Sequence, residues 1–212
     1  MNTNNKLNKA NSYRLSQELL RNKALKKGVN LIAPETIFLS KDTLFGKNVT
    51  IDPYVVIGPS VKIGDNSHIK SFSHLEGTKI EKNVTVGPYA RLREGTVLKK
   101  NTKIGNFVET KKSFINQNSK VNHLSYIGDT SIGKNSNIGA GTITCNYDGK
   151  VKHKTIVDDG SFVGTNTSLV APLKIGKKAY VAAGSVITSE VPSGALAFGR
   201  AKQVTKKNWK KK

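Results

Sequence analysis

Residues 45–75 divide into units of six, FGKNVT IDPYVV IGPSVK IGDNSH IKSFSH L, and each unit begins with an aliphatic or aromatic anchor residue. The run of anchors resumes at Ile80 after one step of five, and another step of five separates Ile127 from Ile132. A period of six fits neither a helix, which repeats every 3.6 residues, nor an alternating strand, which repeats every two. It fits a short strand followed by a turn, so three units close one triangular coil and the anchors of successive coils stack.

Two other positions of the six-residue unit suit such a coil. Glycine often follows the anchor, as at Gly58 and Gly64, and supplies the backbone freedom of a tight turn. A small or β-branched residue, such as Val61 or Ser67, lies four positions after the anchor and fits the narrow interior. Stacked strands lie about 4.8 Å apart, so a stack of roughly eight coils is expected to form a prism about 35–40 Å tall. The predicted fold class is an all-β solenoid of hexapeptide repeats, in which neighbouring coils stabilise one another.

The repeat is interrupted at two places. Residues 144–156, TCNYDGKVKHKTI, break the period and are predicted to leave the coil as a loop. A milder break lies between Ile104 and Ile115. Ligand contacts usually gather where a polar segment leaves a regular framework, so the loop is a candidate part of a binding site.

The two ends of the chain differ from the repeat. Leucines recur at roughly helical spacing over 12–27, with Gly28 as the stop, which predicts a short N-terminal helix. Pro192 and Gly194 are expected to end the coil. The predicted organisation is a helical linker segment at 1–30, a β-helix domain at 31–189 and a basic C-terminal tail at 190–212.

The chain carries 35 Lys and Arg against 14 Asp and Glu, a net charge of +21. More than half of this excess lies in the two end segments, which is typical of a solvated, lysine-rich periphery. Basic tails attract any polyanion weakly and in a salt-dependent way. Trp209 is the only aromatic residue among the C-terminal bases, so no specific nucleic-acid partner is expected.

Composition also excludes several classes of protein. No apolar stretch is long enough for a transmembrane helix, and the first residues, MNTNNKLNKANSY, lack the apolar core of a secretory signal. Cys145 is the single cysteine, which excludes an intramolecular disulfide and favours a reducing, cytoplasmic location.

His123, in KVNHLSYIGD, is the candidate general base, because a near-neutral imidazole suits acyl transfer from a thioester to an amine. His68 and His74 are interpreted as surface residues of the coils. They do not combine with His123 at the spacing of a three-ligand zinc site, so no metal is expected. Thioester aminolysis requires no covalent enzyme intermediate, so Cys145 is not assigned as a nucleophile.

Four segments carry a specific resemblance. NFVETKKSFI, KVNHLSYIGDTSIGKNSNIGAGTITCNYDGKVKHKTIV, SLVAPLKIG and AAGSVITSEVPSGALAFGRAKQ resemble the acetyltransferase half of the bifunctional bacterial N-acetylglucosamine-1-phosphate uridyltransferase/glucosamine-1-phosphate N-acetyltransferase family. The resemblance runs from about residue 12 to 209 and implies a left-handed parallel β-helix that assembles as a homotrimer. Only the resemblance implies that hand, because parallel β crossovers are normally right-handed. It further implies a cytoplasmic enzyme of UDP-N-acetylglucosamine biosynthesis, with acetyl-CoA and glucosamine 1-phosphate as substrates.

The resemblance also implies roles for individual residues. His123 resembles the general base that takes a proton from the sugar amine, and Glu109 resembles the carboxylate that orients it. Thr165 replaces the serine usual in the family and keeps its hydroxyl. Positions that match the sugar-phosphate contacts are Arg93, Lys111, Tyr126, Asn137 and Lys152. Positions that match the acetyl-CoA contacts are Ala140, Asn146, Tyr147, Thr165, Ala183 and Arg200.

The family's uridyltransferase half has no counterpart in this sequence, so uridyl transfer by this chain is not expected. Either the chain is a natural split enzyme, with a separate uridyltransferase as partner, or it is a fragment. One alternative function is a hexapeptide-repeat acyltransferase for another amino sugar. The other is a non-catalytic solenoid that binds polyanions through its basic tails.

Overall fold

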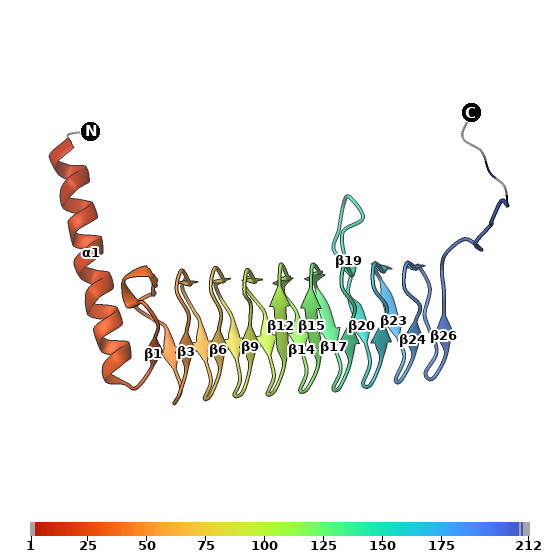
Figure 1. The fold of residues 1–212 in the computed structure, drawn as a ribbon, viewed down its shortest axis with the longest axis horizontal. Helices are drawn as coiled ribbons and strands as arrows, with labels where there is room; N and C mark the ends of the chain where they lie inside the picture. Colours follow the sequence, from red (N-terminus) through yellow and green to blue (C-terminus); the bar gives the residue numbers. More distant parts are fainter. Residues whose placement is uncertain (1–2, 208, 210–212) are drawn as a thin grey trace.

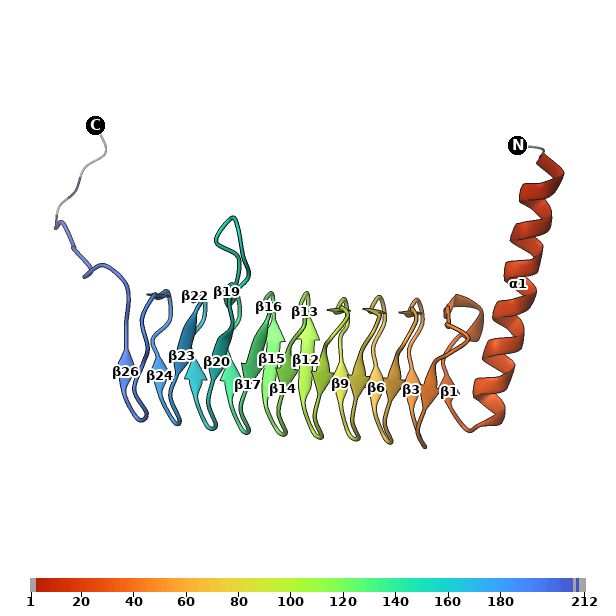
Figure 2. The same ribbon diagram turned by 180° about the vertical axis from the view of Figure 1, so that it is seen from behind.

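The computed structural model describes residues 3–207 and 209, and their side chains from residue 5 onward. Residues 1–2, 208 and 210–212, which belong to the predicted end segments, lie outside the described residues. A helix, α1 (Thr3–Lys26), and a short 3-10 helix, η1 (Pro34–Thr36), precede short strands that wind into an elongated prism (Figures 1 and 2). Helix α1 lies across one end of this prism and the C-terminal segment leaves the other. No described helix is long and apolar enough to cross a lipid bilayer.

The strands form three parallel sheets, here named A, B and C. Sheet A contains β1 (Asn30–Leu31), β3 (Thr50–Ile51), β6 (His68–Ile69), β9 (Thr85–Val86), β12 (Lys103–Asn106), β15 (Lys120–His123), β18 (Asn137–Ile138), β21 (Phe162–Val163), β24 (Tyr180–Val181) and β26 (Leu196–Ala197). Sheet B contains β4 (Val56–Ile57), β7 (His74–Leu75), β10 (Arg91–Leu92), β13 (Glu109–Lys111), β16 (Tyr126–Gly128), β19 (Ile143–Cys145), β22 (Ser168–Val170) and β25 (Val186–Ile187). Sheet C contains β2 (Leu44–Phe45), β5 (Lys62–Ile63), β8 (Lys79–Ile80), β11 (Val97–Leu98), β14 (Phe114–Ile115), β17 (Thr130–Ile132), β20 (Thr155–Val157) and β23 (Leu173–Ile175).

Equivalent residues of successive coils are paired. Ile51 is in register with Ile69, and Ile69 with Val86, so the chain returns to the same position after 17 or 18 residues. The backbone N–H of each coil donates to a carbonyl of the next, as from Thr50 to Ser67 at 3.0 Å. These pairings confirm the predicted parallel solenoid, and the left-handed sense stays a prediction.

The core is the stack of anchor residues. Leu75, Leu98 and Ile104 have no exposed surface. Two threonines, Thr110 and Thr144, occupy anchor positions and are also buried. The apparent break between Ile104 and Ile115 is therefore an ordinary unit of the repeat with a polar anchor. The Thr110 hydroxyl lies 3.0 Å from that of Thr96, and Thr144 Oγ1 accepts a 2.7 Å hydrogen bond from a backbone N–H, so neither buried hydroxyl lacks a partner.

The predicted N-terminal helix is present, but its predicted start and the predicted end of the coil were wrong. Helix α1 begins at Thr3 instead of Ser12, because its first half is polar and exposed and so lacks the leucine pattern that marked the second half. The coil also continues past Pro192 and Gly194. Gly194 adopts a φ of 72° and forms an ordinary corner, after which β26 pairs with β24.

The second half of α1 closes one end of the prism. Ala24 is buried against the first coil. The Gln17 side chain makes two hydrogen bonds with the backbone of Leu39, donating at 2.9 Å and accepting at 2.8 Å. The helix thus satisfies backbone groups that a further coil would otherwise bond.

The three corners of the prism are named by the sheets that they join. All the predicted five-residue steps, and the long excursion, lie at the BC corner. The excursion covers 146–154, a shorter segment than the predicted loop, because β19 and β20 on either side keep their places in the sheets. It projects beyond the prism in Figures 1 and 2.

The other two corners carry ladders of side chains. At the CA corner six asparagines at positive φ are joined by side-chain hydrogen bonds of 2.9–3.2 Å: Asn48, Asn66, Asn83, Asn101, Asn118 and Asn135. At the AB corner four aromatic rings stack at centroid distances of 4.8–5.1 Å: Tyr54, Phe72, Tyr89 and Phe107. Leu124 continues this column, and the rings are about half exposed.

Replacing Leu98 by alanine should lower the unfolding free energy by about 2–5 kcal/mol, because the cavity lies between coils that cannot collapse independently. Leu44→Ala, in a strand of the same sheet, is the matched control, since Leu44 is half exposed and its truncation should cost less than about 0.5 kcal/mol. Urea denaturation followed by circular dichroism measures both. Equal losses for the two variants would contradict a core made of stacked anchors.

Candidate active site

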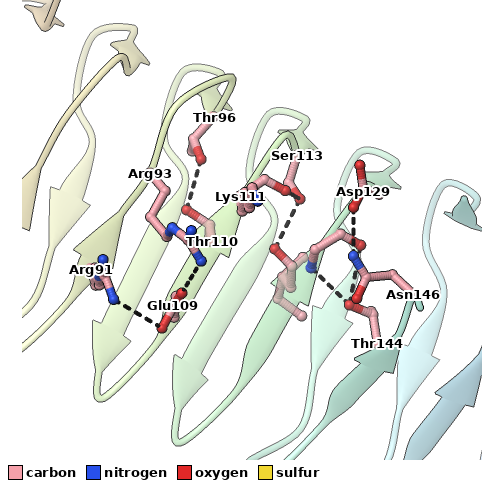
Figure 3. A network of polar contacts seen from close by, with 12 residues as sticks. Arg91, Arg93, Thr96, Glu109, Thr110, Lys111, Ser113, Asp129, Thr144 and Asn146 are labelled. Carbon is pink, nitrogen blue, oxygen red and sulfur yellow. Dashed lines mark hydrogen bonds and ion pairs between the residues drawn. The ribbon is translucent and has the colours of Figure 1, made fainter. Parts of the chain in front are cut away.

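Charged side chains gather on the outer face of sheet B. Glu109 begins β13 and accepts a 2.8 Å hydrogen bond from Arg93, one coil earlier, while Arg91 lies 4.0 Å from its other oxygen. Figure 3 shows the Glu109 carboxylate between the two guanidinium groups. Glu109 and Arg93 are about one-third exposed. The carboxylate thus neutralises part of the arginine charge and fixes the Arg93 side chain.

Lysines extend this cluster at the BC corner. Lys111 ends β13, and Lys152 reaches it from the excursion. The ammonium group of Lys152 beside it, with Arg93 nearby, lowers the pKa of Lys111 from its usual range. Three like charges repel one another unless an anion lies between them, so Arg93, Lys111 and Lys152 form a site suited to a dianion such as a phosphate monoester.

Tyr126 lies on the same outer face of sheet B, at the start of β16. It is in register with Glu109, and a Cβ on Gly128 would stand 2.5 Å from the tyrosine oxygen. Glycine at position 128 therefore lets the tyrosine ring lie flat along its own strand. The same hypothetical Cβ would stand 2.8 Å from Nδ2 of Asn146, so the Tyr126 hydroxyl and the Asn146 amide lie over one backbone position.

Asn146 is anchored where the excursion leaves the coil. It is 6% exposed, and its amide donates a 2.5 Å hydrogen bond to Asp129 (Figure 3). The backbone carbonyl of Asn146 accepts a hydrogen bond from the backbone N–H of His153 at 2.8 Å, which closes the base of the excursion. The excursion is thus tied to the prism at its base.

The tip of the excursion is a tight hairpin. Tyr147 and Lys152 pair as an antiparallel bridge, and Gly149 adopts a φ of 97°, which favours glycine. The Asp148 carboxylate accepts hydrogen bonds from His153 Nε2 at 2.7 Å and from the backbone N–H groups of Lys150 and Val151 at 2.8 Å. The His153 bond, followed by the two backbone bonds, holds the pKa of Asp148 well below its usual range.

His123 ends β15 at the AB corner, and its ring is exposed. Its Nδ1 lies 2.5 Å from Oδ1 of Asn106, one coil earlier. The structure of this chain therefore gives His123 an asparagine partner, whereas Glu109 bonds Arg93. The predicted orienting role of Glu109 stays a prediction, because no contact between Glu109 and His123 is seen within the chain.

A column of small residues continues from His123 along the AB corner. Backbone hydrogen bonds stack Ala140 on His123, Thr165 on Ala140 and Ala183 on Thr165. Gly164 is buried behind this column, where a Cβ would stand 2.4 Å from the Ala183 nitrogen. His123 thus lies beside the end of the aromatic column, and small residues follow it at the equivalent positions of the next coils.

The remaining predicted site residues lie apart from both groups. Asn137 is on sheet A, paired with Lys120 and Phe162, around the AB corner from Tyr126. Tyr147 is exposed on the excursion, and Arg200 is exposed beyond β26. One chain therefore does not bring all the predicted contacts to a single face.

Several residues beside the site were not predicted: Arg91, Asn106, Gly128, Asp129, Asp148 and His153. For Asn106 the sequence did hold a signal, because it precedes His123 by 17 residues, the length of one coil. For the hairpin contacts it held none, because the excursion has no repeat. Among residues 3–207 and 209, no group of three or more His, Cys, Asp or Glu side chains could hold a metal ion.

Comparison with known proteins agrees with this geometry. A model of the bacterial transferase hexapeptide (six repeats) matches residues 42–77, and one of the hexapeptide repeat of succinyl-transferase matches 154–189. An LpxA of Acinetobacter baumannii has the same fold, with a TM-score of 0.66, 19% identity and coverage of 78% of this chain and 70% of that one. A Francisella novicida UDP-N-acetylglucosamine acyltransferase has a TM-score of 0.67, 19% identity and coverage of 76% and 64%. The chain is a hexapeptide-repeat β-solenoid protein.

Sequence relatives are more specific. The bifunctional protein GlmU of Agrobacterium fabrum is 54% identical over 203 residues, which are 96% of this chain and 45% of the relative. That of Zymomonas mobilis is 50% identical over 209 residues, 99% of this chain and 46% of the relative. The chain is a homologue of the GlmU proteins and spans slightly less than half their length, which confirms the resemblance stated from the sequence.

Removing the charge of Lys152 should raise the pKa of Lys111 toward its ordinary value, because Lys152 is the largest cause of its depression. Lysine side-chain NMR titration of wild-type protein and Lys152→Met measures the shift. Lys150→Met is the matched control, since Lys150 is on the same hairpin and does not contribute to the lowered pKa. An unchanged Lys111 titration in Lys152→Met would contradict the clustering of the two ammonium groups.

Proposed function

We propose that this chain is a glucosamine-1-phosphate N-acetyltransferase, which transfers the acetyl group of acetyl-CoA to the 2-amino group of glucosamine 1-phosphate. The observation that carries the proposal is the Arg93, Lys111 and Lys152 cluster at one edge of sheet B, with His123 at the other edge. A phosphorylated amino sugar has a dianionic phosphate that the cation cluster can bind and an amine that His123 can deprotonate. The homology to bifunctional GlmU proteins supports the same assignment.

His123 is proposed as the general base. The neutral sugar amine attacks the thioester carbonyl, so a C–N bond forms and the C–S bond to CoA breaks. The imidazole accepts the proton that the amine loses and returns it to the departing thiolate. The Asn106 side chain at Nδ1 fixes the orientation of the ring.

The column of small residues along the AB corner is proposed as the acetyl-CoA site. Ala140, Thr165 and Ala183 leave room for a slender chain that ends at His123. Arg200, with Asn146 and Tyr147 of the excursion, would complete the contacts to the cofactor. Because the Thr165 hydroxyl is retained, replacement of the usual serine should change affinity little.

We further propose that the working enzyme is a homotrimer. Asn137 lies on sheet A, whereas Tyr126 and the cations lie on sheet B, so a neighbouring copy is needed to bring both kinds of contact to one substrate. The half-exposed aromatic column at the AB corner is an apolar surface that such a copy would cover. A cytoplasmic location and a role in UDP-N-acetylglucosamine biosynthesis complete the proposal.

Thiol release from acetyl-CoA tests the reaction and the acceptor together. Purified protein should release CoA rapidly with glucosamine 1-phosphate and slowly with glucosamine or glucosamine 6-phosphate, because only the 1-phosphate places its dianion against the cations. Release with another amino sugar would favour a related hexapeptide-repeat acyltransferase. His123→Ala should lower turnover by about 10²–10⁴-fold. His74→Ala, a surface histidine of sheet B, should retain activity, and near-normal turnover by His123→Ala would remove His123 from the mechanism.

Light scattering tests the assembly. Wild-type protein should elute with the mass of three chains, and Phe107→Asp, which places a charge in the aromatic column, should shift it toward monomer and lower activity. Asn101→Asp, at the CA corner, is the control and should remain trimeric. A wild-type monomer with full activity would contradict a site completed by a neighbouring copy.

A further inference from the structure

The hairpin of the excursion holds the ammonium group of Lys152 close to other positive charges, which is electrostatically unfavourable. Lys152 stands beside Lys111 and near Arg93, so without a ligand the three positive charges repel one another. Lys152 is exposed and lies on a nine-residue excursion, where a flexible chain would let it move away. Something in the excursion must therefore restrain it.

The restraint next to Lys152 is a side-chain pair. His153, its immediate neighbour, is bonded through Nε2 to the Asp148 carboxylate at 2.7 Å. The other Asp148 oxygen accepts from the backbone N–H groups of Lys150 and Val151, which fixes the turn that leads to Lys152. One carboxylate thus joins the two arms of the hairpin on either side of the lysine.

The pair is independent of the anchorage at the base of the excursion. The Asn146 side-chain amide donates to Asp129 on the prism. The Asn146 backbone carbonyl accepts a hydrogen bond from the His153 backbone N–H, so the His153 ring takes no part in this anchorage. Neither Asp148 nor His153 touches Arg93 or Lys111 through any hydrogen bond or ion pair in the described chain. The Asp148–His153 pair therefore acts on the hairpin alone.

We propose that Asp148 and His153 are positioning residues, whose hydrogen bond holds Lys152 against Lys111 and so prepares the cation cluster for the phosphate of the acceptor. This inference rests on the proposed function, which supplies the acceptor. A lysine that is already in place binds the dianion without first paying for a change of conformation, and apparent affinity falls in proportion to the fraction of molecules in the competent state. The pair thus contributes to phosphate recognition without contacting the substrate.

Steady-state kinetics with two acceptors test the proposal. His153→Leu should raise the KM for glucosamine 1-phosphate by about three- to tenfold, because the competent fraction falls accordingly. The kcat and the KM for acetyl-CoA should stay near wild type, as should the KM for unphosphorylated glucosamine. A merely structural role would raise both acceptor KM values alike, and that result, or no change in either, would overturn the proposal.

Two further variants separate the hydrogen bond from the bulk of the side chain. His153→Gln should restore the wild-type KM, because its amide can donate to the Asp148 carboxylate. Asp148→Ala, which removes all three hydrogen bonds, should have the largest effect and should speed amide hydrogen exchange at Lys150 and Val151. Asp159→Ala is the matched control, since Asp159 accepts a 2.6 Å bond from the Lys134 backbone far from the cations. A His153→Gln variant no better than His153→Leu would contradict the proposal.

Direct binding distinguishes a failure of the positioning role from a failure of the proposed function. If wild-type protein does not acetylate glucosamine 1-phosphate, the proposed function fails. Calorimetric titration with the same sugar phosphate then tests the pair, and the Kd should be similar for wild type and His153→Gln and weaker for His153→Leu. Equal Kd values for all three proteins, or no binding by wild type, would overturn the positioning role.

Discussion

The constraint on which the structure depends is that each coil satisfies its backbone hydrogen bonds through the next. Strands of two to four residues cannot be stable alone, and here they are paired on both sides along the prism. Parallel pairing without slip stacks each residue on its equivalent 17 or 18 positions away. The anchors, the asparagine ladder and the aromatic column are all consequences of this register.

The same register builds the candidate site. Asn106 meets His123, and Arg93 meets Glu109, because each pair is separated by about one coil. The corner positions require positive φ, which costs most residues energy, and asparagine tolerates it best after glycine. At the AB corner aromatic residues accept this conformation up to Phe107, and Gly141 replaces them beyond Leu124. The change of side chain leaves small residues beside His123.

Much of this could be predicted from the sequence, because the period of six records the register directly. The six-residue spacing of the anchors from Ile51 to Leu75 predicts the solenoid without any information about long-range contacts. Thr110 and Thr144 each concealed one unit of the repeat, since a polar residue at an anchor position gives no hydrophobic signal. The structure explains these residues through their hydrogen-bond partners. Residues 3–11 of α1 were missed for a related reason, because the side chains described there are exposed and form no apolar pattern to detect.

The BC corner explains why the site lies where it does. Corners AB and CA carry ladders that join the side chains of several successive coils, and an inserted residue there would break contacts on both sides. The BC corner has no such ladder in the described chain. The step between the anchors of sheets B and C there is four, five or six residues, or includes the whole excursion. Strand register does not depend on this corner, so its length can vary without loss of the core. Lys111 and Lys152 therefore meet at the BC corner, where the length of the chain can be adapted to ligand binding without disturbing the fold.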